Sequence, residues 1–222
     1  MNGGHICVSG IDVDTLRFVR PVFASGLDRS FVMEQKSQLV RHFNLVEMEF
    51  KKYIPSDEYH TEDWLLNESF APRFVRRLTS DEVSRILDQT SVSNLRLAFE
   101  PKNRSLFNVK AKRILSIWHE QYEKFKVRLT FEDAAGNIYN RIPVTDLLTL
   151  SFVKYQISRG NSRYANELIS IFNRCPDRYV RIGLTRPWLG KYWTQVTALI
   201  TVPDLFGGSC FFDFEQKMGD QV

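Results

Sequence analysis

Short segments in which apolar and polar residues alternate recur along the chain, and this pattern limits the folds that the chain can adopt. Alternation at a period of two places the apolar side chains on one face of an extended strand. The segments that alternate in this way, or are short apolar runs, cover residues 6–11, 16–23, 45–53, 125–131, 138–142, 179–184 and 191–202. Such strands are typical of small barrels and sandwiches, whereas a doubly wound parallel sheet has continuously apolar strands.

Turn residues between these segments predict two hairpins. Asp12 to Asp14 separates residues 6–11 from residues 16–23, and Asp133 to Asn137 separates residues 125–131 from residues 138–142. Acidic and glycine-containing turns between alternating segments return the chain antiparallel to itself.

Two helices interrupt the strands. Thr79 to Glu82 forms a capping-box pattern ahead of an amphipathic segment, and residues 163–173 form a second amphipathic helix that ends before Pro176. Residues 145–155 fit either a helix capped by Asp146 or a further alternating strand. The predicted fold class is therefore mainly β, a β-rich α+β fold.

Composition excludes several classes of protein. Of the 222 residues 43% are hydrophobic, which excludes intrinsic disorder. No apolar run approaches the roughly 18 residues of a membrane span, and the first residues lack a signal-peptide pattern, so we predict a soluble, cytoplasmic protein. The three cysteines are odd in number and unrelated in spacing, and they predict neither a disulfide framework nor a metal site.

A polar stretch between Gln89 and Arg104 is the predicted domain boundary. It divides the chain into residues 1–100 and residues 101–222, each with about five candidate strands and one clear helix.

The region from Arg181 to Trp193 is the main candidate binding site. Within thirteen residues it combines the cations Arg181, Arg186 and Lys191 with Trp188, Tyr192 and Trp193. Cations neutralise a nucleic-acid backbone, and aromatic rings stack on unpaired bases. The alternative is structural, with Trp193 in the core and Arg186 paired with Asp146.

Other cations extend the candidate surface. Arg17 and Arg20 lie three residues apart, hence on opposite faces of a strand, and Arg20 either reaches a ligand or pairs with Asp12 or Asp14. The remaining candidates lie just beyond the predicted boundary and are Lys110, Lys112 and Arg113. A solvated charged face is the alternative for these three.

No catalytic motif is present in the sequence. The four histidines lack the i, i+4 spacing of a helical metal site, and neither a glycine-rich phosphate loop nor a nucleophile elbow occurs. We therefore predict a protein that is not an enzyme, with no metal and no cofactor.

Several short motifs together resemble the bacterial dual OB-containing domain family. They are Gly3-Gly4-x-x-Cys7-x-x-Gly10, Arg17-Phe-Val-Arg-Pro-Val22, His60-Thr-Glu-Asp-Trp64-Leu, Pro143-Val-Thr-Asp146, Arg181-Ile-Gly-Leu-Thr-Arg-Pro187 and Trp193-x-Gln-Val. The resemblance implies two small OB-like antiparallel barrels with a few interposed helices. Members of the family begin with a further strand before the glycine pair, so it also implies a first barrel without its outermost N-terminal strand.

The resemblance further implies a non-catalytic nucleic-acid-binding module, an accessory subunit that acts with an effector protein, in the setting of prokaryotic defence systems. The alternative function is a protein–protein adaptor in which the arginines are structural ion pairs. An enzyme with a dispersed carboxylate or arginine site is a third, weaker alternative.

Overall fold

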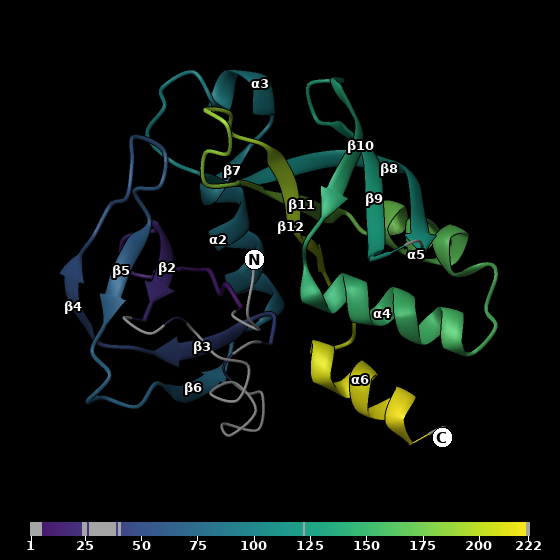
Figure 1. Cartoon of the computed structure of the whole chain (residues 1–222), viewed down its shortest axis with the longest axis horizontal. Coiled ribbons are helices and arrows are strands. Elements are labelled where there is room, and N and C mark those ends of the chain that lie inside the picture. The colour runs from purple at the N-terminus through teal and green to yellow at the C-terminus, as the bar shows by residue number, and fades with distance from the viewer. Residues whose placement is uncertain (1–5, 24–25, 27–38, 40, 122, 221–222) are drawn as a thin grey trace. The chain divides into compact units, whose positions relative to one another are not determined.

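The computed structural model describes residues 6–23, 26, 39, 41–121 and 123–220, and Figure 1 shows its helices and strands. The chain divides into two compact units, Met1–Thr90 with Lys102–Ser105, and Ser91–Pro101 with Leu106–Val222. The chain thus passes between the units three times within a short stretch. The division at residue 100 stays a prediction.

A closed five-stranded barrel forms the second unit. The strand order is β8 (Leu106–Gln121), β9 (Phe125–Asp133), β10 (Ile138–Val144), β12 (Thr194–Val202) and β11 (Asp177–Leu184), and β11 pairs back with β8. All neighbours are antiparallel except β10 and β12, which run parallel at Val144 and Val196. The predicted hairpin at residues 125–142 is present as β9 and β10.

Alternating side chains of these strands fill the barrel. Val127, Leu129 and Phe131 of β9 are buried with Val180 and Ile182 of β11 in one core. The alternation that predicted the strands therefore separates inward from outward side chains, as expected for a barrel wall.

Two helices lie between β10 and β11 in the chain, and a third follows β12. They are α4 (Leu147–Ser158) and α5 (Tyr164–Arg174), and α6 (Phe211–Gly219) follows the last strand and packs on α4. Asp146 accepts hydrogen bonds from the backbone N–H groups of Leu148 (3.2 Å) and Thr149 (3.1 Å), so the ambiguous segment 145–155 is a capped helix. A five-stranded barrel of this kind is an OB fold, and the predicted β-rich fold class is confirmed.

Two shorter elements complete the second unit. β7 (Ser91–Val92) pairs in parallel with β8, and α3 (Leu95–Ala98) begins at Asn94, whose side chain accepts hydrogen bonds from the backbone of Arg96 and Leu97.

The described strands of the first unit form a four-stranded sheet and a two-stranded ribbon. The sheet order is β1 (Gly10–Ile11), β2 (Phe18–Val22), β5 (Asp63–Leu66) and β4 (Phe50–Tyr53). The predicted N-terminal hairpin is present, since Gly10 pairs with Val19 and Ile11 with Phe18. The motif residues Gly3 and Gly4 lie outside the described residues.

The ribbon corrects one prediction from the sequence. Residues 45–53 alternate as a single strand, but the chain divides there into β3 (Asn44–Glu47) and β4, and β3 pairs with β6 (Arg73–Arg77). Only two residues, Met48 and Glu49, separate the strands, so alternation continues although the chain changes its pairing partner.

The helix α2 (Ser80–Thr90) begins at the predicted capping box. The backbone N–H of Thr79 donates to Glu82 Oε2 at 2.8 Å, and the backbone N–H of Glu82 donates to Thr79 Oγ1 at 3.3 Å. Among the described residues, no helix combines the length and the apolar character that a membrane crossing requires.

Candidate nucleic-acid interface

The connection between β11 and β12 is a tight hairpin, which we call the 185–193 hairpin. Trp188 and Lys191 exchange backbone hydrogen bonds of 2.9 and 3.1 Å around the two turn residues Leu189 and Gly190. Both turn residues have positive φ angles, 52° and 72°, as a type I′ turn requires. The turn therefore holds the backbone of the hairpin tip in one conformation.

Aromatic and apolar side chains of the hairpin are exposed to solvent. The exposed fraction is 67% for Trp188, 82% for Leu189 and 52% for Trp193. Arg186 and Lys191 are exposed as well. The sequence-based alternative that Trp193 is a core residue is therefore wrong.

The pairing of the hairpin places rings and cations together. Trp188 and Lys191 form a bridge pair, so their side chains extend from the same face of the hairpin. Trp193 lies opposite Thr185, whose backbone N–H donates to the carbonyl of Trp193 at 2.9 Å. Of the predicted residues, Arg186, Trp188 and Lys191 lie on this hairpin.

A second aromatic and cationic group lies on the outer surface of the barrel. The guanidinium of Arg141 in β10 lies 4.5 Å from the ring centroid of Trp118 in β8. Arg128 of β9 pairs in register with Trp118 and donates a hydrogen bond of 3.3 Å to the carbonyl of Arg141. Sequence reasoning missed this group because the strand that carries Trp118 was not predicted.

The cations Lys112 and Arg113 of β8 converge on one carboxylate. Lys112 Nζ and Arg113 Nε each donate to Glu132 at 2.8 Å, and these hydrogen bonds lower the pKa of Glu132. The pairing of β8 with β9 shifts between Ala111 and Arg113, and such a bulge lets two successive side chains reach the same acid. Lys110 instead lies over the ring of Tyr179 at 6.0 Å.

Arg181 occupies a different environment from the hairpin cations. Its Nε donates to Asn108 Oδ1 at 2.9 Å, across the pairing of β11 with β8. Burial lowers its pKa to about 10, and the charge of Asp146 offsets this effect only in part. Asp146, which we considered as a partner of Arg186, therefore acts on Arg181.

Arg20 belongs to a buried group in the first unit, which we call the β5 charge cluster and define as Arg20, Glu62, Asp63 and Ser105. Arg20 Nε donates to Asp63 Oδ1 at 2.5 Å, and Arg20 Nη2 lies 4.0 Å from Glu62 Oε2. Glu62 also accepts from the backbone N–H (2.6 Å) and the hydroxyl (2.9 Å) of Ser105.

The cluster holds Arg20 in its charged form. Burial opposes the charge, but the hydrogen bond and the charge of Asp63 outweigh it and raise the pKa of Arg20. Asp12, proposed above as a partner of Arg20, instead accepts backbone N–H groups of Asp14 and Thr15 within its own turn. Arg17 is exposed in the segment that precedes β2.

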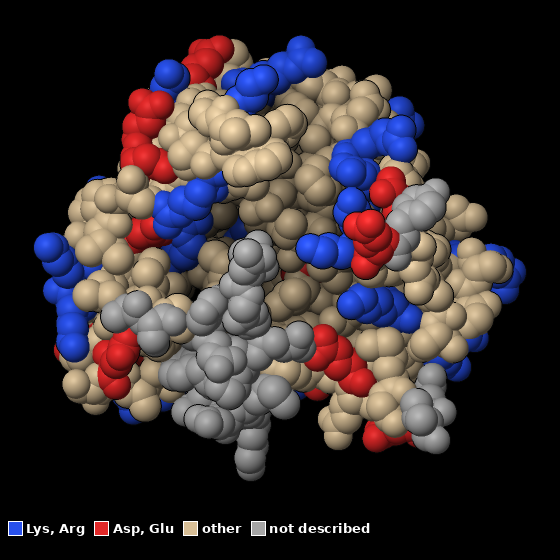
Figure 2. Space-filling view, in the orientation of Figure 1, with Lys and Arg blue, Asp and Glu red and all other residues tan. Residues whose placement is uncertain are grey.

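The cations exposed on one face of the molecule lie in several places. Figure 2 shows Lys and Arg side chains in separate groups, with Asp or Glu beside several of them. Within the described part of the chain, no group of three or more His, Cys, Asp and Glu side chains has the geometry of a metal site.

The second unit is thus an OB-type barrel whose connection between the fourth and fifth strands carries exposed tryptophan and lysine. A model of the dual OB-containing domain family matches residues 1–199, and the chain belongs to this family. No curated protein and no solved structure matches the chain.

Proposed function

We propose that this protein is a nucleic-acid-binding module and that the 185–193 hairpin contacts the nucleic acid. The observation that carries the proposal is Trp188, whose ring is two-thirds exposed at a fixed turn and directly opposite Lys191. An exposed ring of this size gains from stacking on an unpaired base, and the adjacent ammonium group neutralises a phosphate.

The position of the hairpin in the barrel supports the proposal. In OB folds, oligonucleotides bind to the face of the second and third strands and to the loop between the fourth and fifth strands. Here these elements are β9, β10 and the 185–193 hairpin. The Trp118–Arg141 pair, with Arg141 on β10, offers a second ring and cation for the same ligand.

Stacking favours single strands over duplexes, since only unpaired bases expose their faces. We therefore propose a single-stranded ligand without strong sequence preference. An accessory role beside an effector protein, which the sequence resemblance implied, remains a prediction about partners.

A salt series with labelled single- and double-stranded DNA and RNA tests the proposal. The logarithm of the affinity for single strands falls with the logarithm of the salt concentration at about 0.7 per neutralised phosphate. The Arg186→Ala/Lys191→Ala protein should bind single strands more weakly, with a slope shallower by up to about 1.4. Arg163→Ala/Arg174→Ala removes the same charge from exposed positions of α5 and its start, and it should leave the slope unchanged.

The competing function is a protein–protein adaptor, and Leu189 favours it because an aliphatic side chain that is 82% exposed suits an apolar pocket of a partner. An adaptor would bind no nucleic acid even at low salt. Equal slopes for the hairpin and control variants would also overturn the proposed contact.

A further inference from the structure

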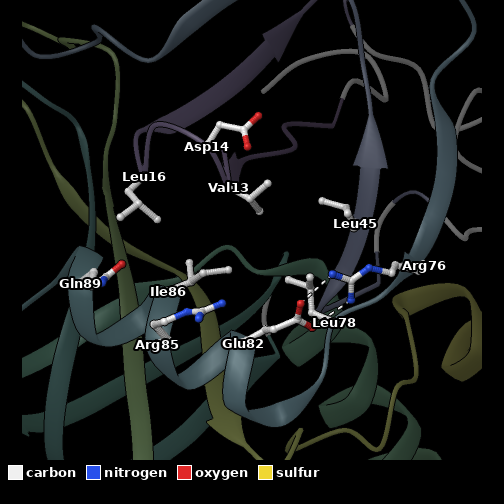
Figure 3. Close-up of a pocket in the computed structure, with 10 residues that line it drawn as sticks. All are labelled: Val13, Asp14, Leu16, Leu45, Arg76, Leu78, Glu82, Arg85, Ile86 and Gln89. Atoms are coloured by element: carbon white, nitrogen blue, oxygen red, sulfur yellow. Dashed lines mark hydrogen bonds and ion pairs between the residues drawn. The ribbon is translucent and has the colours of Figure 1, made fainter.

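A pocket of about 350 Å³ lies within the first unit, far along the chain from the 185–193 hairpin. Figure 3 shows that the turn between β1 and β2, the strand β3 and the helix α2 all supply side chains to it. Its apolar surface consists of five aliphatic residues, Val13, Leu16, Leu45, Leu78 and Ile86. None of the five is fully buried, although they lie on three separate segments.

One pair of charges at the pocket is already neutralised. Arg76 donates from Nη1 and Nη2 to the two carboxylate oxygens of Glu82 at 2.9 and 2.6 Å. Glu82 also caps α2 through Thr79. This pair is therefore a fixed part of the pocket wall and brings no net charge.

Three other polar side chains line the pocket, namely Asp14, Arg85 and Gln89. Among the residues that the structure describes, none hydrogen-bonds to these side chains or forms an ion pair with them. Figure 3 shows Asp14 and Arg85 on opposite sides of the pocket, with Val13 and Ile86 between them. One carboxylate and one guanidinium are thus available at its two sides.

We propose that the pocket binds a small zwitterion whose ammonium and carboxylate groups stand at opposite ends of an apolar body. The ammonium pairs with Asp14, the carboxylate pairs with Arg85, and the body covers the aliphatic surface. The chemistry is that of an ω-amino acid or a short apolar peptide with both termini charged.

The size of the pocket sets the size of the ligand. The pocket has a volume of about 350 Å³. It lies at the lower end of the range for small-molecule sites, about 300–1,000 Å³. Because Asp14 and Arg85 lie on opposite sides of the pocket with Val13 and Ile86 between them (Figure 3), a ligand that pairs with both carries its two charges at opposite ends of its body.

The charges of the pocket also disfavour a nucleic acid. Asp14 would repel a phosphate, and the charges of Arg76 and Glu82 compensate each other. The proposal therefore does not depend on the nucleic-acid contact proposed for the hairpin.

Calorimetry on the full chain with 6-aminohexanoate, hexanoate, hexylamine and glycine tests the proposal. We expect binding of 6-aminohexanoate and at least about tenfold weaker binding of hexanoate and hexylamine, because each lacks one charged contact. Glycine, which lacks the body, should not bind. The dipeptide Leu-Leu distinguishes an ω-amino acid from a short peptide as the natural ligand. Tighter binding of Leu-Leu than of 6-aminohexanoate would indicate a peptide, and weaker binding would indicate an ω-amino acid.

Two variants assign the contacts. Arg85→Gln should reduce the affinity for 6-aminohexanoate to that for hexylamine, and Asp14→Asn should reduce it to that for hexanoate. Both side chains are exposed, so neither variant is expected to unfold the protein, and Arg163→Gln and Glu58→Gln are matched exposed controls. Absence of 6-aminohexanoate binding, equal binding of hexanoate, or an equal loss in the control variants would overturn the proposal.

Discussion

The β5 charge cluster and the 185–193 hairpin use arginine and lysine in opposite ways. In the cluster, Arg20 lies beside two carboxylates that are at most 4% exposed, and only 11% of its own side chain is exposed. In the hairpin, Lys191 and the ring of Trp188 project from a turn into solvent. Both regions show a mixture of cations and apolar residues in the sequence.

The two cations differ because of the residue that strand pairing places opposite each of them. Arg20 pairs directly with Asp63 of the neighbouring strand, so the acid is supplied by the sheet itself. The hairpin tip has no further strand beyond Leu189 and Gly190, and across from Lys191 lies Trp188 rather than an acid. A cation opposite a buried carboxylate stabilises the fold, whereas a cation opposite an exposed ring is available to a ligand.

Replacement of Arg20 by alanine should have the largest effect. It leaves Asp63 buried without the cation that donates to it, which costs about 3–5 kcal/mol of the free energy of unfolding. Urea unfolding of the full chain measures the loss, and Arg17→Ala is the exposed control. If the variant kept its stability but bound nucleic acid more weakly, Arg20 would be a ligand contact and not a structural ion pair.

Replacement of Trp188 by alanine should act on binding alone. Loss of one stacking ring weakens the affinity for a single strand by about 1–3 kcal/mol, roughly 5- to 150-fold. The melting temperature should not change, because the ring is largely exposed. Trp188→Phe keeps a stacking surface and should retain most of the affinity in the same titration.

Leu189→Asn should stabilise the hairpin slightly. A leucine at φ 52° is strained, whereas Asn-Gly is the preferred pair for a type I′ turn, so we expect a gain of up to about 1 kcal/mol. Thermal unfolding detects the gain. Unchanged nucleic-acid affinity would support the proposed contact through Trp188, and a loss of affinity would indicate that Leu189 itself contacts the ligand.

Removal of the exposed Arg76–Glu82 ion pair should have the smallest effect on stability. This effect can be recognised by its dependence on pH. Hydrogen bonds from Arg76 and Thr79 lower the pKa of Glu82 to about 2, below the 4.5 of an unperturbed glutamate. The stabilisation is therefore fully present above pH 4.5 and is lost as the pH falls through about 2. The difference in urea midpoint between the wild-type protein and Glu82→Gln should follow this course; a constant difference would contradict it.

Local patterns predicted much of the fold. The capping box at Thr79, the β9–β10 hairpin and the helix at residues 164–174 each depend on residues close in sequence. The longest strand, β8, was not predicted, because its pairing shifts between Ala111 and Arg113 and again between Ile114 and Ser116. Each shift interrupts the period of two on which strand prediction depends.

The same limit applies to the candidate sites. The turn at Leu189 and Gly190 could be predicted from four neighbouring residues, but the partner of Arg20 lies 43 residues away along the chain. Pairing at that distance follows from strand order, which one sequence does not reveal. Trp193 shows the converse, since a core position was the structural alternative for this residue and 52% of it is exposed.

The two hydrogen bonds from Ser105 to Glu62 have a consequence for the order in which the protein forms during synthesis. The first unit needs Lys102–Ser105, which emerges from the ribosome only after the first elements of the second unit, β7 and α3. Until Ser105 arrives, the Glu62 carboxylate lacks two of its donors. The first unit therefore reaches its final structure only when translation has already entered the second.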